Sequence, residues 1–123
     1  MNILAIDFGQ KNIGLAWTNT EVGVVLPFGL AKSSELAGLI KKEKIDQVVV
    51  GLPLGLDGQE NANTARVRVF VSELQSSVNV PVEFYDERFS SKAADAMSDG
   101  GVSRDEKSAM VILEDYLAQK KNK

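Results

Sequence analysis

Residues 1–17 read MNILAIDFGQKNIGLAW. An apolar run, Ile3–Ile6, stops at Asp7, and Gly9 then opens a short polar turn. The run predicts a buried strand, and the residues after it predict a hairpin turn into a second strand at 13–18. A core strand that ends on a carboxylate holds that side chain at a rigid edge of a sheet. The stretch therefore predicts the start of a meander and one candidate functional residue, although Asp7 could instead satisfy the backbone of the turn.

The rest of the chain extends this hairpin into an alternation of strands and helices. A looser third strand is predicted at 23–31, and later segments are recognised by apolar runs, helical spacing of apolar residues and capping signals. These segments are a helix from about 33, the strand QVVVG at 47–51, a helix around 67–74, a strand at 82–85, a short helix from Ser90 or Ser91 to Gly100, and a last helix that begins with the capping box Ser103–Glu106. The predicted order β-β-β-α-β-α-β-α-α is that of an α/β domain over residues 1–123, with a mixed sheet and helices on both faces.

The composition excludes several kinds of chemistry. The chain has 123 residues, of which 44% are hydrophobic, and contains no histidine and no cysteine. Disulfides, cysteine nucleophiles, zinc held by Cys or His and a Ser-His-Asp triad are therefore excluded. Acid–base or metal chemistry must rest on carboxylates, Lys, Tyr or water, and oxygen ligands of this kind suit Mg²⁺ or Mn²⁺.

Charge and hydropathy limit the partners. No apolar stretch reaches the roughly 18 residues that a membrane-spanning helix needs, and no signal-peptide pattern follows Met1. We therefore expect a cytoplasmic protein with no membrane partner. The net charge is −3, so nucleic acid would have to be bound through local basic patches.

Carboxylates from distant parts of the sequence converge in the predicted fold. Asp7 ends the first strand, and Asp86 and Glu87 end the last one. If these strands are parallel neighbours in the centre of the sheet, both carboxyl ends reach one edge, where open α/β sheets form their sites. Asp105 lies at the N-terminal end of the last helix, on its inward apolar stripe. The three positions then point to one place.

Each carboxylate also has a simpler interpretation. Asp86 and Glu87 could form a surface ion-pair group with Arg88. Asp105 could serve only to stabilise the helix N-terminus as an anion, and Glu106 is better explained by the capping box. Crowded carboxylates repel one another, however, and usually share a cation. The glycines of GLPLGLDGQ, residues 51–59, either admit a ligand to the backbone or shape a turn.

Four motifs in order resemble the YqgF/RuvX family: ILAIDFGQKNIGLAW, VVVGLPLGLDGQ, YDERFSS and DEKSAMVILEDYL. These are small bacterial proteins with an RNase H-like fold, described as candidate Holliday junction resolvases and candidate pre-16S rRNA nucleases. The resemblance implies catalytic carboxylates at Asp7, at Glu87 with Asp86 beside it, and at Asp105. It also implies that Asp7, Glu87 and Asp105 hold two Mg²⁺ or Mn²⁺ ions about 4 Å apart.

The substrate would be reached through the turn and the basic residues around the carboxylates. Gly9 would let a phosphate approach the first turn, and Lys11 matches a position that is usually basic or polar in the family. Arg88, Arg104 and Lys107 neighbour the carboxylates in sequence and are the other candidate substrate contacts.

The preferred interpretation is a metal-dependent endonuclease acting on structured nucleic acid, with 5′-end processing of pre-16S rRNA as the first choice. Cleavage of Holliday junctions is the alternative within the same class, and a dimer would favour it, because a four-way junction needs two symmetric cuts. A non-catalytic nucleic-acid or protein adaptor is the alternative from another class. The oligomeric state, monomer or homodimer, stays open at this point.

Overall fold

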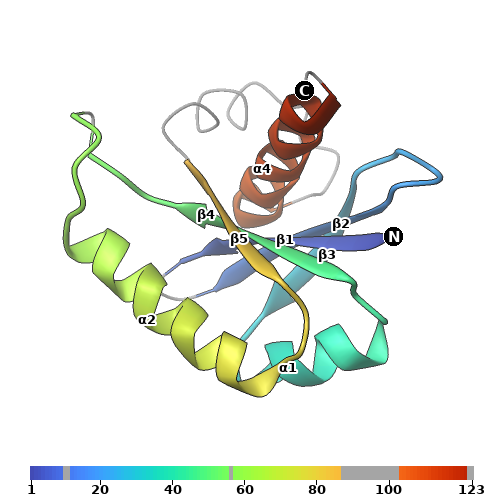
Figure 1. The fold of residues 1–123 in the computed structure, drawn as a ribbon, viewed down its shortest axis with the longest axis horizontal. Coiled ribbons are helices and arrows are strands. Elements are labelled where there is room, and N and C mark those ends of the chain that lie inside the picture. Colours follow the sequence, from blue (N-terminus) through green and yellow to red (C-terminus); the bar gives the residue numbers. More distant parts are fainter. Residues whose placement is uncertain (10–11, 56, 87–102, 122–123) are drawn as a thin grey trace.

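In the computed structural model, five strands form one mixed sheet in the order β3-β2-β1-β4-β5 (Figure 1). The structure describes residues 1–9, 12–55, 57–86 and 103–121. The strands are β1 Asn2–Phe8, β2 Ile13–Asn19, β3 Leu26–Ala31, β4 Gln47–Leu52 and β5 Val82–Asp86, and the helices are α1 Ser33–Lys42, α2 Ala62–Ser77 and α4 Arg104–Lys121. The predicted short helix between Ser90 and Gly100 lies outside the described residues.

The first three strands form the predicted meander, and the last two are added in parallel. β1 pairs antiparallel with β2, and β2 pairs antiparallel with β3. β4 runs parallel to β1, and β5 runs parallel to β4. Pro27 is tolerated in β3 because this strand lies at the edge of the sheet, where a missing backbone donor costs least.

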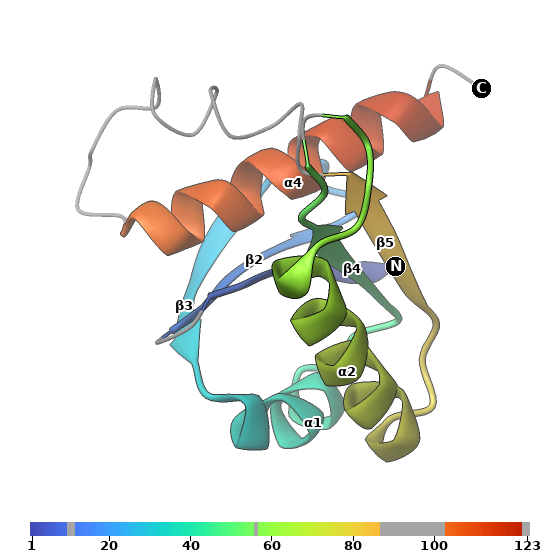
Figure 2. The same ribbon diagram turned by 90° about the vertical axis from the view of Figure 1, so that its left-hand side faces the viewer.

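Helices cover both faces of the sheet, as predicted. Figure 2 shows α4 on one side and α1 and α2 on the other. In β1 the side chains of Leu4 and Ile6 belong to the core beneath α1 and α2, whereas Ile3 and Ala5 belong to the core beneath α4. The apolar run of β1 does not alternate with polar residues because both of its faces are buried. The mixed α/β architecture is therefore confirmed.

The strand order differs from the one on which the expected convergence of carboxylates was conditional. β1 and β5 are parallel but are not neighbours, because β4 lies between them and β5 occupies the edge. All six residues of β4 are buried, which requires a strand on each side and cover on both faces. β5 is less buried, and its Phe84 is 38% exposed, as suits an edge strand. Because β1, β4 and β5 are parallel, the C-terminal ends of β1 and β5 still lie at the same end of the sheet, but in strands two positions apart.

The start of α4 follows the predicted capping box. The backbone N–H of Glu106 donates to Ser103 Oγ at 3.2 Å, and the Glu106 carboxylate accepts from Ser103 in return. The N–H of Lys107 donates to the carbonyl of Ser103 at 3.0 Å, so Ser103 is the N-cap.

Within the described ranges, no helix is both long and apolar enough to cross a lipid bilayer.

Candidate functional site

Asp7 lies near the end of β1, between glycines on both neighbouring strands. It pairs with Gly14 of β2, and it follows the Ile6–Val50 pair, which places it level with Gly51 of β4. Phe8 stacks on Phe70 of α2, with ring centroids 4.5 Å apart. Because successive side chains of a strand point to opposite faces, Asp7 faces the α4 side of the sheet. The two strand positions beside Asp7, Gly14 and Gly51, contribute no side chains of their own on that face.

Asp105 is brought to Asp7 through Gly14. A Cβ atom on Gly14 would lie 2.1 Å from the carbonyl oxygen of Asp105 and 2.8 Å from its Cβ atom. The first turn of α4 therefore rests directly on the backbone of β2 at the residue opposite Asp7. Directly opposed Cβ positions are about 5 Å apart, so the Cβ atoms of Asp7 and Asp105 lie within roughly 8 Å of each other. Asp7 and Asp105 therefore lie near each other on the α4 side of the sheet.

Glu106 ties the same turn of α4 to the edge strand β3. Its Oε2 atom accepts a hydrogen bond from the backbone N–H of Gly29 at 2.8 Å. Gly29 has φ +96°, a conformation that glycine adopts readily. Reasoning from the sequence missed Gly14 and Gly29, because neither their close packing nor their pairing leaves a local signal. The only signal for Gly14 in the sequence is its place directly before the second apolar run, and this place does not indicate a contact with the last helix.

Asp86 does not join Asp7 and Asp105. In β5, Val82 packs into the core beneath α1 and α2, and Tyr85 packs beneath α4. The alternation of β5 puts Asp86 on the side of Val82, opposite Leu52 of β4. Asp86 is therefore on the other face of the sheet from Asp7, and two strands away, about 10 Å laterally. Its neighbour Glu87, predicted beside it, lies outside the described residues.

Of the predicted substrate contacts, three lie within the described residues and two do not. Arg104 is exposed and Lys107 partly exposed in the first turns of α4, beside Asp105. Gly9 is packed against its own turn, since a Cβ there would lie 2.5 Å from the carbonyl oxygen of Asn12. Lys11 and Arg88 lie outside the described residues.

Comparison with known proteins decides the family. The model of the RuvX family, described as Holliday junction resolvase, matches residues 1–119. The chain belongs to the RuvX family. A relative from Maridesulfovibrio salexigens, named as a candidate pre-16S rRNA nuclease, is 37% identical over 134 aligned residues that cover 97% of this chain and 99% of the relative. A relative of the same name from Phocaeicola vulgatus is 36% identical, and the alignment covers 97% of this chain and 96% of the relative.

A solved structure confirms the fold of this RuvX-family chain. Thermus thermophilus RuvC, in complex with a Holliday junction substrate, superposes with a TM-score of 0.68 at 12% sequence identity, covering 98% of this chain and 96% of RuvC. RuvC has the RNase H-like fold, so the predicted RNase H-like architecture is correct. At this identity the likeness concerns the fold alone.

The donor atoms at the RuvX-family site suit a hard divalent cation. Asp7 and Asp105 supply carboxylate oxygens, the ligands that Mg²⁺ and Mn²⁺ prefer. In the part of the chain that the structure describes, no group of three or more acidic, His or Cys side chains is close enough to hold a metal ion. Among the described residues, Asp7 and Asp105 lie near each other. The third predicted ligand, Glu87, lies outside the described residues.

A second polar cluster fixes the far end of α4. The buried Gln47 side chain donates from Nε2 to the Tyr116 hydroxyl at 2.6 Å. Burial, with the carboxylate of Glu83 nearby, raises the pKa of Tyr116 to about 12. Burial likewise raises the pKa of Asp115, against the opposing effect of a hydrogen bond from Tyr85. These contacts hold α4 on β4 and β5 and leave its first turn to be positioned by β2 and β3.

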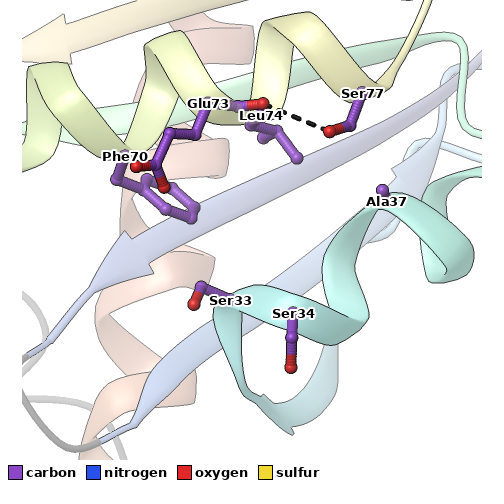
Figure 3. Close-up of a pocket in the computed structure, with 7 residues that line it drawn as sticks. All are labelled: Ser33, Ser34, Ala37, Phe70, Glu73, Leu74 and Ser77. Atoms are coloured by element: carbon purple, nitrogen blue, oxygen red, sulfur yellow. Dashed lines mark hydrogen bonds between the residues drawn. The ribbon is translucent and has the colours of Figure 1, made fainter.

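A hollow of about 330 Å³ lies between α1 and α2, shown in Figure 3. Its lining residues are Ser33, Ser34, Ala37, Phe70, Glu73, Leu74 and Ser77. Both helices pack on the face of the sheet opposite α4. The hollow is therefore separated by the sheet from Asp7 and Asp105, and it is not part of their site.

Proposed function

We propose that this RuvX-family chain is a metal-dependent endonuclease that processes the 5′ end of pre-16S rRNA in the cytoplasm. One observation carries the proposal: α4 rests on Gly14, which brings Asp105 beside Asp7 at the carboxyl edge of an RNase H-like sheet. The names of the relatives from M. salexigens and P. vulgatus support the choice of an RNA precursor as substrate.

Asp7 and Asp105 would hold Mg²⁺ or Mn²⁺ together with Glu87. When bound, two such ions would supply an activated water for in-line attack on phosphorus and would stabilise the leaving 3′-oxygen. The protein's own contribution is rigidity. Asp7 sits on a core strand anchored by Phe8 on Phe70, and Asp105 is held by the capped start of α4. Arg104 and Lys107 would attract the phosphate backbone to this edge of an otherwise acidic protein.

Cleavage of Holliday junctions is the second candidate. The description of the RuvX family model favours it, and RuvC, which shares the fold, was solved with a junction. Two symmetric cuts in a four-way junction need two active sites, so this function requires a dimer. A monomer in solution that cuts the RNA precursor would support the first proposal.

One assay tests both candidates. The chain is incubated with 5′-extended 16S precursor RNA and with a four-way DNA junction, in Mn²⁺ or in EDTA. We expect Mn²⁺-dependent cutting of the RNA, and loss of cutting in Asp7→Asn. The matched control is Asp46→Asn: Asp46 lies just before β4 and accepts from the backbone of Asn2, which an amide oxygen can also do. If wild type cuts neither substrate and its melting temperature is unmoved by millimolar Mn²⁺, a non-catalytic adaptor is the better explanation.

A further inference from the structure

The carboxylate of Glu106 makes more contacts than a helix cap requires. Oε1 accepts from the Ser103 hydroxyl at 3.0 Å and from the Ser103 N–H at 3.4 Å, which completes the capping box. Oε2 is left over from that motif, and it accepts the N–H of Gly29 at 2.8 Å. Gly29 is 77 positions away in the sequence and lies on a different element. One side chain therefore joins the start of α4 to the edge of the sheet.

The strand β3 is shaped to provide this donor. Its pairing with β2 shifts between Leu15 and Ala16: Gly29 faces Leu15, Pro27 faces Ala16, and Phe28 is the extra residue of a bulge. Bulges of this kind redirect groups away from the regular ladder and are frequent next to active sites. Gly29, at φ +96°, follows the extra residue. The bulge presents a backbone donor to the Glu106 side chain of α4.

The anchor is adjacent to the contact that brings the carboxylates together. Gly14 pairs with Asp7 on one side and with Leu30, the residue after Gly29, on the other. Glu106 follows Asp105 directly in α4, so the hydrogen bond to Gly29 lies about one strand spacing from the place where Asp105 rests on Gly14. A bond at this position restricts sliding and rotation of the first turn of α4 over β2.

We propose that Glu106 is a positioning residue that holds Asp105 on Gly14, within reach of Asp7, and that its bond to Gly29 carries this role. The proposal rests on the proposed function, because it concerns the geometry of that metal site. Glu106 itself need not touch substrate. Partners that orient a metal ligand commonly change metal affinity or activity by about 10–100-fold when they are removed.

Two variants separate positioning from capping. Ser103 and Gly29 donate to different oxygen atoms of Glu106, and Glu106→Gln keeps the length of the side chain but replaces one of these acceptors with an NH2 donor, so it cannot accept from both at their present positions. Ser103→Ala removes the hydroxyl of the cap and keeps both oxygens of Glu106, so the bond to Gly29 survives. Glu114→Gln is the matched control, since Glu114 is exposed on the same helix and the charge change is identical.

The measurements are Mn²⁺ affinity by titration calorimetry, amide hydrogen exchange of Gly29 by NMR, and cleavage kinetics. In Glu106→Gln we expect faster exchange at Gly29, Mn²⁺ binding weaker by about 10-fold or more, and kcat lower by about 10–100-fold with KM for RNA changed less than about twofold. Ser103→Ala should lower the melting temperature but change Mn²⁺ affinity by less than about twofold. Glu114→Gln should match wild type.

Two results would overturn the inference. The first is unchanged Gly29 exchange and Mn²⁺ affinity in Glu106→Gln. The second is an equal loss of Mn²⁺ affinity in Ser103→Ala, which would mean that capping alone is responsible. If wild type neither binds Mn²⁺ nor cuts RNA, the proposed function fails. The amide resonance of Gly14 then decides the positioning role: Gly14 is far from residue 106 in sequence, and its resonance should shift in Glu106→Gln if Glu106 sets that contact and stay unchanged if it does not.

Discussion

The substitution Gly14→Ala tests the contact on which the candidate site depends. The added Cβ would lie 2.1 Å from the carbonyl oxygen, 2.3 Å from the carbonyl carbon and 2.8 Å from the Cβ atom of Asp105. Non-bonded carbon atoms rest about 3.5–4.0 Å apart. The first two atoms belong to the backbone and cannot rotate away, so the start of α4 must move by roughly 1 Å or more.

The expected size of the effect follows from this displacement. Forcing a methyl group into a closed contact costs about 1–3 kcal/mol. At roughly 4 °C for each kcal/mol, the melting temperature should fall by roughly 4–12 °C. Moving Asp105 away from Asp7 by about 1 Å should lower kcat by about 100-fold.

The sign of the stability change makes the test sharp. Gly14 does not have a positive φ, so in open space an alanine there would stabilise the fold by about 0.4–1 kcal/mol through the unfolded state. Gly38 in α1 is the matched control, because a Cβ there meets nothing within 4 Å. Gly38→Ala should raise the melting temperature and leave cleavage unchanged. Thermal unfolding and single-turnover cleavage measure both effects. A Gly14→Ala protein that melts at or above wild type and cuts normally would refute the packing of Asp105 on Gly14.

Four further outcomes are expected. Asp7→Asn should abolish cleavage at equal or higher melting temperature, whereas Asp86→Asn, on the other face of the sheet, should lower kcat less than about 10-fold in the same assay. Mn²⁺ at about 100 times its dissociation constant should add roughly 2.7 kcal/mol to the free energy of unfolding, measured by thermal shift and reduced in Asp7→Asn. Arg104→Ala should weaken RNA binding and flatten its salt dependence, whereas Lys121→Ala at the far end of α4 should do neither. Because the folded-state pKa of Tyr116 is about 12, against an ordinary value of 10.0, its folded form keeps a proton that the unfolded form loses, so stability should fall by up to about 2–3 kcal/mol between pH 10 and pH 12. Denaturant unfolding of Tyr116→Phe across that range should show a smaller decline, and an identical decline would contradict the assignment.

Prediction from the sequence succeeded where the signal is local. The apolar run before Asp7, the three valines of QVVVG and the capping box at Ser103–Glu106 each specify an element within a few residues, and all three are present. The order of elements and the cover of helices on both faces follow from these local signals. The family motif that begins at Asp105 and the residues directly on either side of Asp7 also lie within the described residues, and the fold brings Asp7 and Asp105 together.

Prediction failed where the answer depends on which strand lies beside which. The sequence did not decide whether β5 lies next to β1, because only the assembled sheet shows that β4 lies between them. Asp86 was grouped with Asp7 by its place at the end of a strand. The register of β5 against β4, and with it the face on which Asp86 lies, is a non-local property.

The sequence by itself determined that this chain is an α/β protein whose core strand ends on Asp7 and whose last helix begins at a capping box, and that its acid–base or metal chemistry must rest on carboxylates, Lys, Tyr or water. Only the tertiary structure decided that Gly14 is the surface on which Asp105 rests and that Glu106 reaches Gly29 as well as Ser103. The physical reason is one of range. Strand and helix formation depend on residues a few positions apart, whereas the approach of two carboxylates depends on contacts between segments that are 77 or more positions apart and meet only when the sheet is complete.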